Sequence, residues 1–307
     1  MIRLIRAAVF AICVALPTPL TAQDFDVGRD AYVAGDYATA LDNLRPLAEG
    51  GDVNGQFGLA SMYGNGHGVP QDHAEAARWY RLAAEQGDAD SQYNLAQIYR
   101  QGLGVPQDYA EAVRWYRLAA EQGYADAQGS LGFMYKSGQG VPLDYAEAVR
   151  WYRLAAEQGY AIAQYNLGSM YYHGEGVLQD YAEAVRLYQL AAEQGDANAQ
   201  TDLGTMYYHG EGVLQDYAEA VRLYQLAAEQ GDAYAQFSLG AVYYNGAGVL
   251  QSYVLAHMWL NIASTNGSET ALTSRDVAAE KMTRDQIAEA QALARVCMSS
   301  GYQDCDW

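Results

Sequence analysis

Catalysis by a serine or a lysine would require these residues at set spacings, which the sequence does not contain. In Ser-x-x-Lys hydrolases a lysine one helical turn after the serine activates its hydroxyl. The chain has only two lysines, Lys136 and Lys281, and the residues three places before them are Phe133 and Ala278. The motif Gly-x-Ser-x-Gly is missing too, since the order around Ser130 is Gln-Gly-Ser-Leu-Gly. We therefore predict that the protein is not an enzyme.

Two histidines occupy the same place in successive copies of one turn, as His173-Gly-Glu175 and His209-Gly-Glu211. Stacked helical repeats lie roughly 10 Å apart, whereas zinc is held by bonds of about 2 Å. No cysteine lies near to complete a ligand set. We predict a polar turn here, and neither a metal nor a cofactor.

The chain has three cysteines, and two of them lie close together in the sequence. Cys13 lies in the apolar N-terminal stretch, whereas Cys297 and Cys305 form a close pair near the C-terminus. In an oxidising compartment a close pair favours a disulfide over a metal or redox site, and the bond would pin the tail to the last helix. Two free thiols are the alternative.

Residues 1–22 have the pattern of a cleavable export signal. Arg3 and Arg6 precede an apolar run from Ala7 to Leu16, and a small-residue site follows at Ala22. The apolar run is shorter than the ~20 residues that span a bilayer. We predict cleavage after Ala22 and a periplasmic or secreted protein; an uncleaved anchor is the alternative.

The net charge excludes several classes of partner. The full chain carries a formal charge of −19, and removing the leader leaves 16 basic against 37 acidic residues, near −21. A polyanion repels phosphate backbones and anionic lipid surfaces. We expect no nucleic-acid partner and no membrane insertion after cleavage.

The elements that position these residues are set by an internal repeat of 36 residues. The phrase Asp-Tyr-Ala-Glu-Ala-Val-Arg begins at residues 108, 144, 180 and 216, with looser copies before and after. We place unit starts at residues 35, 71, 107, 143, 179, 215 and 251, the last unit being degenerate. The repeat array covers 35–267, after a capping helix at 23–34 and before a helical cap and tail at 268–307.

Each unit predicts two helices. In the unit from residue 107, Asp108 is a good N-cap and Gly123 a good C′ residue for the first helix. The second helix runs from about Asp126 to Lys136, and Gly132 allows close approach of the two axes. Thr283-Arg-Asp-Gln286 fits a capping box, which predicts a helix to about Cys297 or Ser299. A helix from Ser268 to Lys281 precedes it.

These residues resemble the Sel1-like repeat, a relative of the tetratricopeptide repeat. The elements Leu-Gly, Gly-x-Gly-Val and Ala-Ala-Glu-Gln-Gly recur in register over roughly residues 52 to 267. The resemblance implies an all-α fold, a right-handed superhelical α-solenoid that serves as an adaptor, often at the bacterial envelope. Some cysteine-rich relatives are described as hydrolysing β-lactams, but the cysteine pair that they carry in every repeat is missing here.

Comparison of the copies separates constant from variable positions on the second helix. Leu and Tyr recur at fixed places, whereas four other columns vary. Residues four, three and four apart share a helix face, and we do not expect a varying face to form the core between repeats. The resemblance implies that this helix lines the concave groove, where Tyr and Phe suit a peptide. The candidate partner-binding residues are Tyr93, Gln97, Arg100, Phe133, Lys136, Tyr165, Tyr172, His173, Tyr208, His209, Phe237 and Tyr244. The alternative is that these positions are only solvent-exposed, so that their residue types vary without selection for binding.

The sequence thus predicts a monomeric, non-enzymatic scaffold that binds a protein or peptide in the groove. Binding of cell-wall glycan or exopolysaccharide through tyrosine rings is the alternative, and a β-lactamase-like hydrolase is a remote one. The recurring tryptophans are predicted to fill the core, because Leu187 and Leu223 replace them in two copies.

Overall fold

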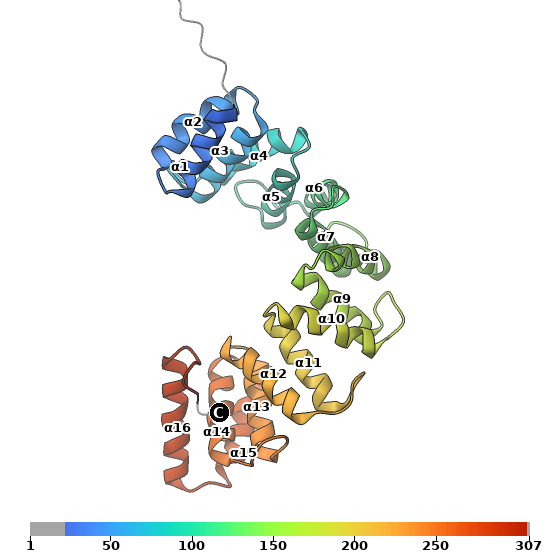
Figure 1. Cartoon of the computed structure of the whole chain (residues 1–307), viewed down its shortest axis with the longest axis vertical. Coiled ribbons are helices and arrows are strands. Elements are labelled where there is room, and N and C mark those ends of the chain that lie inside the picture. Colours follow the sequence, from blue (N-terminus) through green and yellow to red (C-terminus); the bar gives the residue numbers. More distant parts are fainter. Residues whose placement is uncertain (1–21, 306–307) are drawn as a thin grey trace, which may run out of the picture. The chain divides into compact units, whose positions relative to one another are not determined.

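The chain folds into helices only, throughout the residues that the structure describes. The computed structural model describes residues 22–305 (Figure 1). The predicted leader, apart from Ala22, therefore lies outside the described residues. The helices are α1 (Ala22–Val33), α2 (Tyr37–Glu49), α3 (Val53–Asn65), α4 (His73–Glu85), α5 (Ala89–Gln101), α6 (Tyr109–Glu121), α7 (Ala125–Ser137), α8 (Tyr145–Glu157), α9 (Ala161–His173), α10 (Tyr181–Glu193), α11 (Ala197–His209), α12 (Tyr217–Glu229), α13 (Ala233–Asn245), α14 (Tyr253–Thr265), α15 (Glu269–Ala279) and α16 (Arg284–Ser299).

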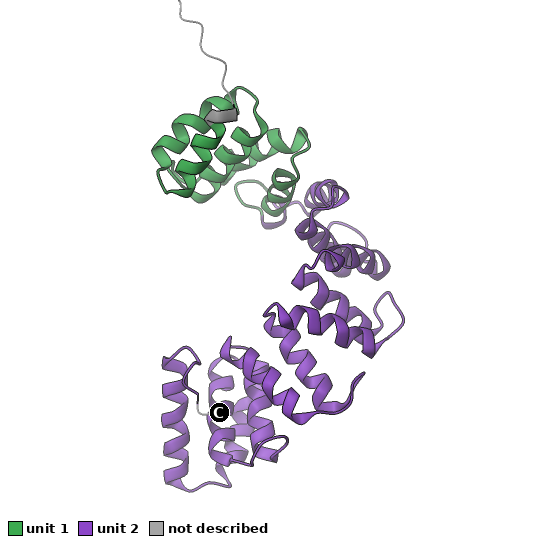
Figure 2. Ribbon diagram, in the orientation of Figure 1, with its two compact units in different colours: residues 1–98, 102–106 green, residues 99–101, 107–307 purple. Residues whose placement is uncertain are grey.

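The helices form two compact units (Figure 2). The first holds the described residues up to Ile98 together with Gly102–Pro106, and the second holds Tyr99–Gln101 and the chain from Gln107 onward. Within each unit, helices that follow one another in the sequence pack together, from α1 to α4 in the first and from α6 to α15 in the second. The last helix, α16, packs against α14. The prediction of an all-α solenoid of tandem repeats is confirmed.

Helix ends lie where the capping residues predict them. Asp108 accepts a hydrogen bond from the backbone N–H of Glu111 at the start of α6, and Gly138 ends α7 in the left-handed conformation. Thr283 and Gln286 form the predicted capping box, and α16 ends at Ser299. These caps satisfy backbone groups that a helix leaves unpaired. The helices α7 and α9 begin at the same place in the repeat without a side-chain cap, after Tyr124 and Tyr160.

Small residues allow the helices of a pair to approach closely, as predicted. A Cβ atom on Gly132 of α7 would lie 2.8 Å from Cδ1 of the Tyr152 ring on α8. In the turn after α9, Gly176 has a φ of +71°, and a Cβ there would lie 2.5 Å from the carbonyl carbon of Tyr145. An L-residue with a side chain would be strained in that turn.

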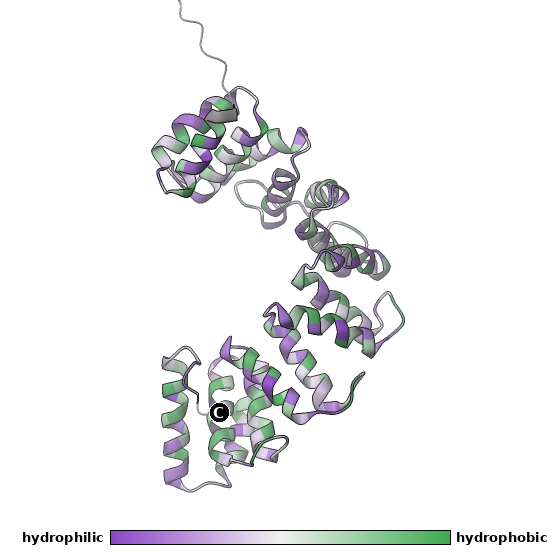
Figure 3. Cartoon of the chain, viewed as in Figure 1, coloured by the Kyte–Doolittle hydropathy of each residue, from purple (hydrophilic) through white to green (hydrophobic). Residues whose placement is uncertain are grey.

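The core is divided into several small clusters of buried hydrophobic residues, each formed by neighbouring helices. Hydrophobic residues therefore recur along every helix, alternating with hydrophilic ones (Figure 3). Trp115, Trp151 and Trp259 are at most 4% exposed, which confirms that the tryptophans fill the core.

Buried glutamines link one repeat to the next. Gln200 on α11 donates from its amide to the carbonyl oxygen of Ala192 and accepts a hydrogen bond from Gln230, 2.9 Å away. Gln128 and Gln158 repeat the arrangement with a separation of 2.8 Å. Polar groups in a core must be paired, so the recurring Gln of each Ala-Ala-Glu-Gln-Gly element has a structural role.

Candidate functional site

The second helices of the repeats place the predicted binding residues on one side. On α9, Ala163, Gln164, Leu167 and Met170 are buried, because they face the neighbouring helices. Tyr165 and Tyr172 lie outside this buried set and are half-buried. The same division recurs on α7, α11 and α13, so we call this side of the second unit the variable face, meaning positions 133, 136, 165, 172, 173, 202, 205, 208, 209, 234, 237 and 244.

Three predicted residues lie on α5, where the two compact units divide. Tyr93 and Gln97 are half-buried in the first unit, where the Gln97 amide donates to the Tyr93 hydroxyl across 2.7 Å. Arg100, in the last turn of α5, is half-buried and belongs to the second unit.

Part of the variable face joins neighbouring repeats, which corrects the expectation that it would not. The ring of Tyr165 on α9 lies 5.6 Å from that of Tyr188 on α10 and packs on the next cluster of buried residues. The physical reason is reach: a tyrosine is long enough to extend from its own helix over the next one. Variation in this column therefore changes core packing as well as surface.

A second set of contacts joins residues 39 positions apart. Lys136 Nζ lies 3.6 Å from a carboxylate oxygen of Glu175, and the Tyr172 hydroxyl donates to Glu211 across 2.9 Å. The hydrogen bond to Glu211 raises the pKa of Tyr172 to about 12. One repeat later the corresponding residues are Tyr208 and Ala247. They form no such polar contact with each other but both pack against one cluster of buried hydrophobic residues. The glutamates of the two His-Gly-Glu turns thus each bind a side chain of the preceding repeat.

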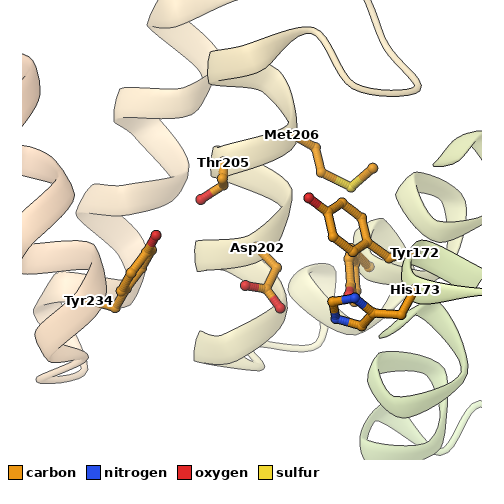
Figure 4. Close-up of a pocket in the computed structure, with 7 residues that line it drawn as sticks. Tyr172, His173, Asp202, Thr205, Met206 and Tyr234 are labelled. Carbon is orange, nitrogen blue, oxygen red and sulfur yellow. The ribbon is translucent and has the colours of Figure 1, made fainter. Parts of the chain in front are cut away.

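The first pocket on the variable face lies between α9, α10, α11 and α13 and has a volume of about 210 Å³. It brings together two predicted residues, Tyr172 and His173, whereas the prediction omitted the others that line it. Its lining is Tyr172, His173, Tyr188, Asp202, Thr205, Met206 and Tyr234. In Figure 4, Asp202 projects from α11 into the space between Tyr234 on one side and His173 and Tyr172 on the other.

Asp202 is the charged residue at the centre of this pocket. Burial raises the pKa of its carboxyl group, and the neighbouring carboxylates Asp232 and Asp196 act in the same direction. A hydrogen bond from Tyr165 and the nearby His173 oppose the shift. The arrangement can accept a hydrogen-bond donor or a cation.

A signal for Asp202 was present in the sequence. The equivalent positions of the other copies hold Asn94, Ser130, Asn166 and Ser238, so residue 202 alone in this column carries a charge. This column lies next to those predicted to line the groove.

A second pocket, of about 200 Å³, lies between α13, α14 and α15. Predicted residues Phe237 and Tyr244 line it, together with Leu260 and Val277. The walls are mainly apolar because Leu260 and Ala241 stand where the two preceding repeats carry a tyrosine and a hydroxyl-bearing Ser or Thr.

The remaining predicted residues lie in neither pocket. Phe133 is 42% exposed on α7, and His209 is exposed at the end of α11, where its ring meets that of Tyr208 edge-on. Of the predicted residues, Tyr172, His173, Phe237 and Tyr244 line the two pockets, and the others lie outside them.

Cys297 and Cys305 are joined by a disulfide, and both are buried. The bond holds the tail against α14 and α16, where the Tyr302 hydroxyl accepts a hydrogen bond from Asn266 across 2.8 Å. Among residues 22–305, no helix is long and apolar enough to cross a bilayer. The same residues contain no group of three or more His, Cys, Asp or Glu side chains arranged to hold a metal.

The chain is similar to solved bacterial proteins. A Sel1 repeat protein from Oxalobacter formigenes is 34% identical, with a TM-score of 0.72, and the match covers 79% of this chain and 97% of that one. A protective antigen of uropathogenic Escherichia coli with an SLR fold is 26% identical over 91% of this chain and 92% of its own, with a TM-score of 0.33. An immunity protein from Pseudomonas aeruginosa is 21% identical over 71% of this chain and 83% of its own, with a TM-score of 0.42. Both scores are too low to bear on what this chain binds.

A comparison with curated proteins finds no significant match. The family model for the Sel1 repeat matches six consecutive segments, at 53–88, 89–124, 125–160, 161–196, 197–232 and 233–268. These segments begin at the second helix of the units drawn from the sequence, so the same period is divided at a different point. By this match, the chain belongs to the Sel1 repeat family.

Proposed function

We propose that the protein is a non-enzymatic scaffold of the bacterial envelope that binds a protein or peptide on the variable face. The observation that carries the proposal is the pair of aromatic pockets that meet at α13, whose Tyr234 lines the first and whose Phe237 lines the second. Half-buried aromatic rings on a rigid frame favour binding, because they supply contact area with few rotors to immobilise.

The envelope location rests on two further observations. Residues 1–22 have the charge and hydropathy pattern of an export signal. The Cys297–Cys305 disulfide fits an oxidising compartment. If the leader is cleaved as proposed, the purified protein begins at Gln23, which N-terminal sequencing checks directly.

Photo-crosslinking in intact cells tests the binding face. A photoreactive residue at Phe133 or Tyr234 reports from the variable face, because both are exposed. The matched control is Leu226 on α12, which is also exposed. It lines a different pocket together with Gln200 and Leu203 of α11, and Asp202 is not part of that pocket. Discrete protein adducts from 133 and 234 with none from 226 are the expected result.

Purified components then give the affinity. Replacing Tyr172 and Tyr208 with Ala is expected to weaken binding of the crosslinked protein at least tenfold, whereas replacing Leu154 and Leu226 with Ala leaves it unchanged. Adducts from position 226 alone, or retention on cell-wall glycan without protein adducts, would overturn the proposal.

A further inference from the structure

Within residues 22–305, Asp202 has no cationic partner, unlike the glutamates that begin the first helices of the repeats in the second unit. The first-turn glutamates each pair with an arginine three residues on, as Glu183 does with Arg186 at 2.7 Å. Glu175 pairs with Lys136. None of the ion pairs among the described residues involves Asp202. Its carboxylate therefore lies in the pocket with a hydrogen bond from Tyr165 but without a lysine or arginine to neutralise it.

The fold does not need a carboxylate at this position. The equivalent residues of four other copies are Asn or Ser, and their helices have the same bounds relative to the repeat. Partial burial disfavours the charged form of Asp202, so the carboxylate reduces stability when ionised. A carboxylate that costs stability, and whose hydrogen bond from Tyr165 leaves its charge without a lysine or arginine partner, is best explained by what it binds.

The walls of the pocket match the shape of a long basic side chain. Tyr172, Tyr188 and Tyr234 surround the carboxylate with aromatic rings, and Tyr234 is 57% exposed at the edge. Lysine and arginine bury an aliphatic stem against apolar surface and keep a charged head. The head group is attracted both by a carboxylate and by the faces of aromatic rings.

The surrounding charge favours the same occupant. Asp196 and Asp232 lie near enough to act on the Asp202 carboxyl group, and the whole chain carries a formal charge of −19. Opposite charge on a partner raises the rate of association and discriminates against acidic competitors. His173 is the one titratable group of the pocket that can add positive charge.

We propose that the pocket around Asp202 receives a single lysine or arginine side chain of the partner protein, with its charged head on the carboxylate and its stem against Tyr172, Tyr188 and Tyr234. This rests on the proposed scaffold function and specifies the partner: a segment with a basic residue that protrudes from its surface. The neighbouring apolar pocket at Phe237 is a separate contact.

Methionine-methyl NMR on the mature chain tests this directly. Met206 lines the pocket, and its methyl resonance reports occupancy, while buried Met258 on α14 serves as an internal reference. The probes are the peptides acetyl-Gly-Ser-Ala-Arg-Ala-Ser-Gly-amide, its lysine version, and its citrulline version, which keeps the shape of arginine without the charge. The basic peptides are expected to shift Met206 saturably and to bind at least tenfold more tightly than the citrulline peptide.

Two variants make the result specific. Asp202→Asn is expected to weaken the basic peptides at least tenfold, and its fold is checked by the unchanged Met258 resonance. Glu289→Gln removes the same charge from an exposed site on α16 and is expected to leave binding unchanged. Equal affinity for the citrulline peptide, unaltered binding by Asp202→Asn, or a Met206 shift produced by calcium chloride and not by the peptides would each overturn the proposal.

The proposed scaffold function and the proposed basic-side-chain pocket are tested by separate measurements. Crosslinking at Phe133 does not involve the pocket, so protein adducts there with no peptide binding would refute the basic-side-chain pocket alone. Absence of adducts from both 133 and 234 would refute the scaffold function.

Discussion

Tyr224 on α12 donates its hydroxyl hydrogen to Oγ1 of Thr205 on α11, across 3.2 Å. The two residues are 19 positions apart, and Tyr188 is likewise hydrogen-bonded to Ser169. In the copy before, the corresponding pair is Tyr152 and Phe133, and the buried Tyr152 hydroxyl has no hydrogen-bond partner among the described residues. A varying column thus decides whether a buried hydroxyl is satisfied.

Replacement of Tyr152 by Phe is therefore expected to stabilise the protein by about 1 kcal/mol, since it removes an unpaired buried hydroxyl. The matched replacement Tyr224→Phe removes a satisfied one and is expected to cost about 1 kcal/mol. Urea unfolding of both variants measures the difference. Equal effects of the two replacements would show that the pairing with position 205 contributes nothing.

The glutamine contacts predict energetic coupling between repeats. Gln200 and Gln230 share a hydrogen bond, so a double-mutant cycle with alanine at both positions is expected to give a coupling energy of about 0.5–1.5 kcal/mol. Gln200 and Gln158 do not touch a common partner, and their effects are expected to add within about 0.5 kcal/mol. Additive effects at Gln200 and Gln230 would contradict the structural role assigned to them.

Three loop leucines are expected to be better replaced by proline. Leu178, Leu214 and Leu250 are 90%, 91% and 92% exposed, and the corresponding residues of three earlier copies are prolines, at 70, 106 and 142. No backbone hydrogen bond from these three leucine N–H groups is found in the described chain. Each replacement should add about 0.4–1 kcal/mol, because proline restricts the unfolded chain. Thermal melts of Leu178→Pro, Leu214→Pro and Leu250→Pro measure the gain, and a lower Tm would show that the later turns differ from the earlier ones.

The stability contribution of Asp202 is expected to depend on pH. Burial raises its pKa in the folded state, so the folded protein holds a proton that the unfolded chain, with a pKa near 3.9, has released. The stabilisation is complete below the unfolded pKa and is lost as the pH rises through the raised value. Asp202→Asn should therefore gain stability relative to the wild type as the pH rises from about 3.9 into the neutral range. Thermal melts of both proteins at these pH values check the sign; a constant difference would contradict it.

The disulfide is expected to stabilise the C-terminal end. The bond closes a short loop, with the cysteines 8 positions apart, which corresponds to roughly 2–3 kcal/mol from restriction of the unfolded chain. Replacing both cysteines with Ala should lower the temperature at which α16 unfolds, as measured by hydrogen exchange. Exchange in α6 serves as the internal control. Reduction of the Ala variant should have no further effect.

The sequence by itself determined the repeat, its period and the ends of its helices. Asp108, Gly138 and Thr283 act on backbone groups a few residues away, so local chemistry decides where these helices start or stop. The same is true of Gly132, whose role follows from the missing side chain.

Only the tertiary structure decided which side chains of different repeats meet. Tyr172 reaches Glu211 and Tyr165 reaches Asp202 because stacked helices bring together residues that are 39 and 37 positions apart in the sequence. A column of one helix carries no information on the position of the next helix. For this reason the sequence located a variable face, while the pocket around Asp202 emerged only when the repeats were packed.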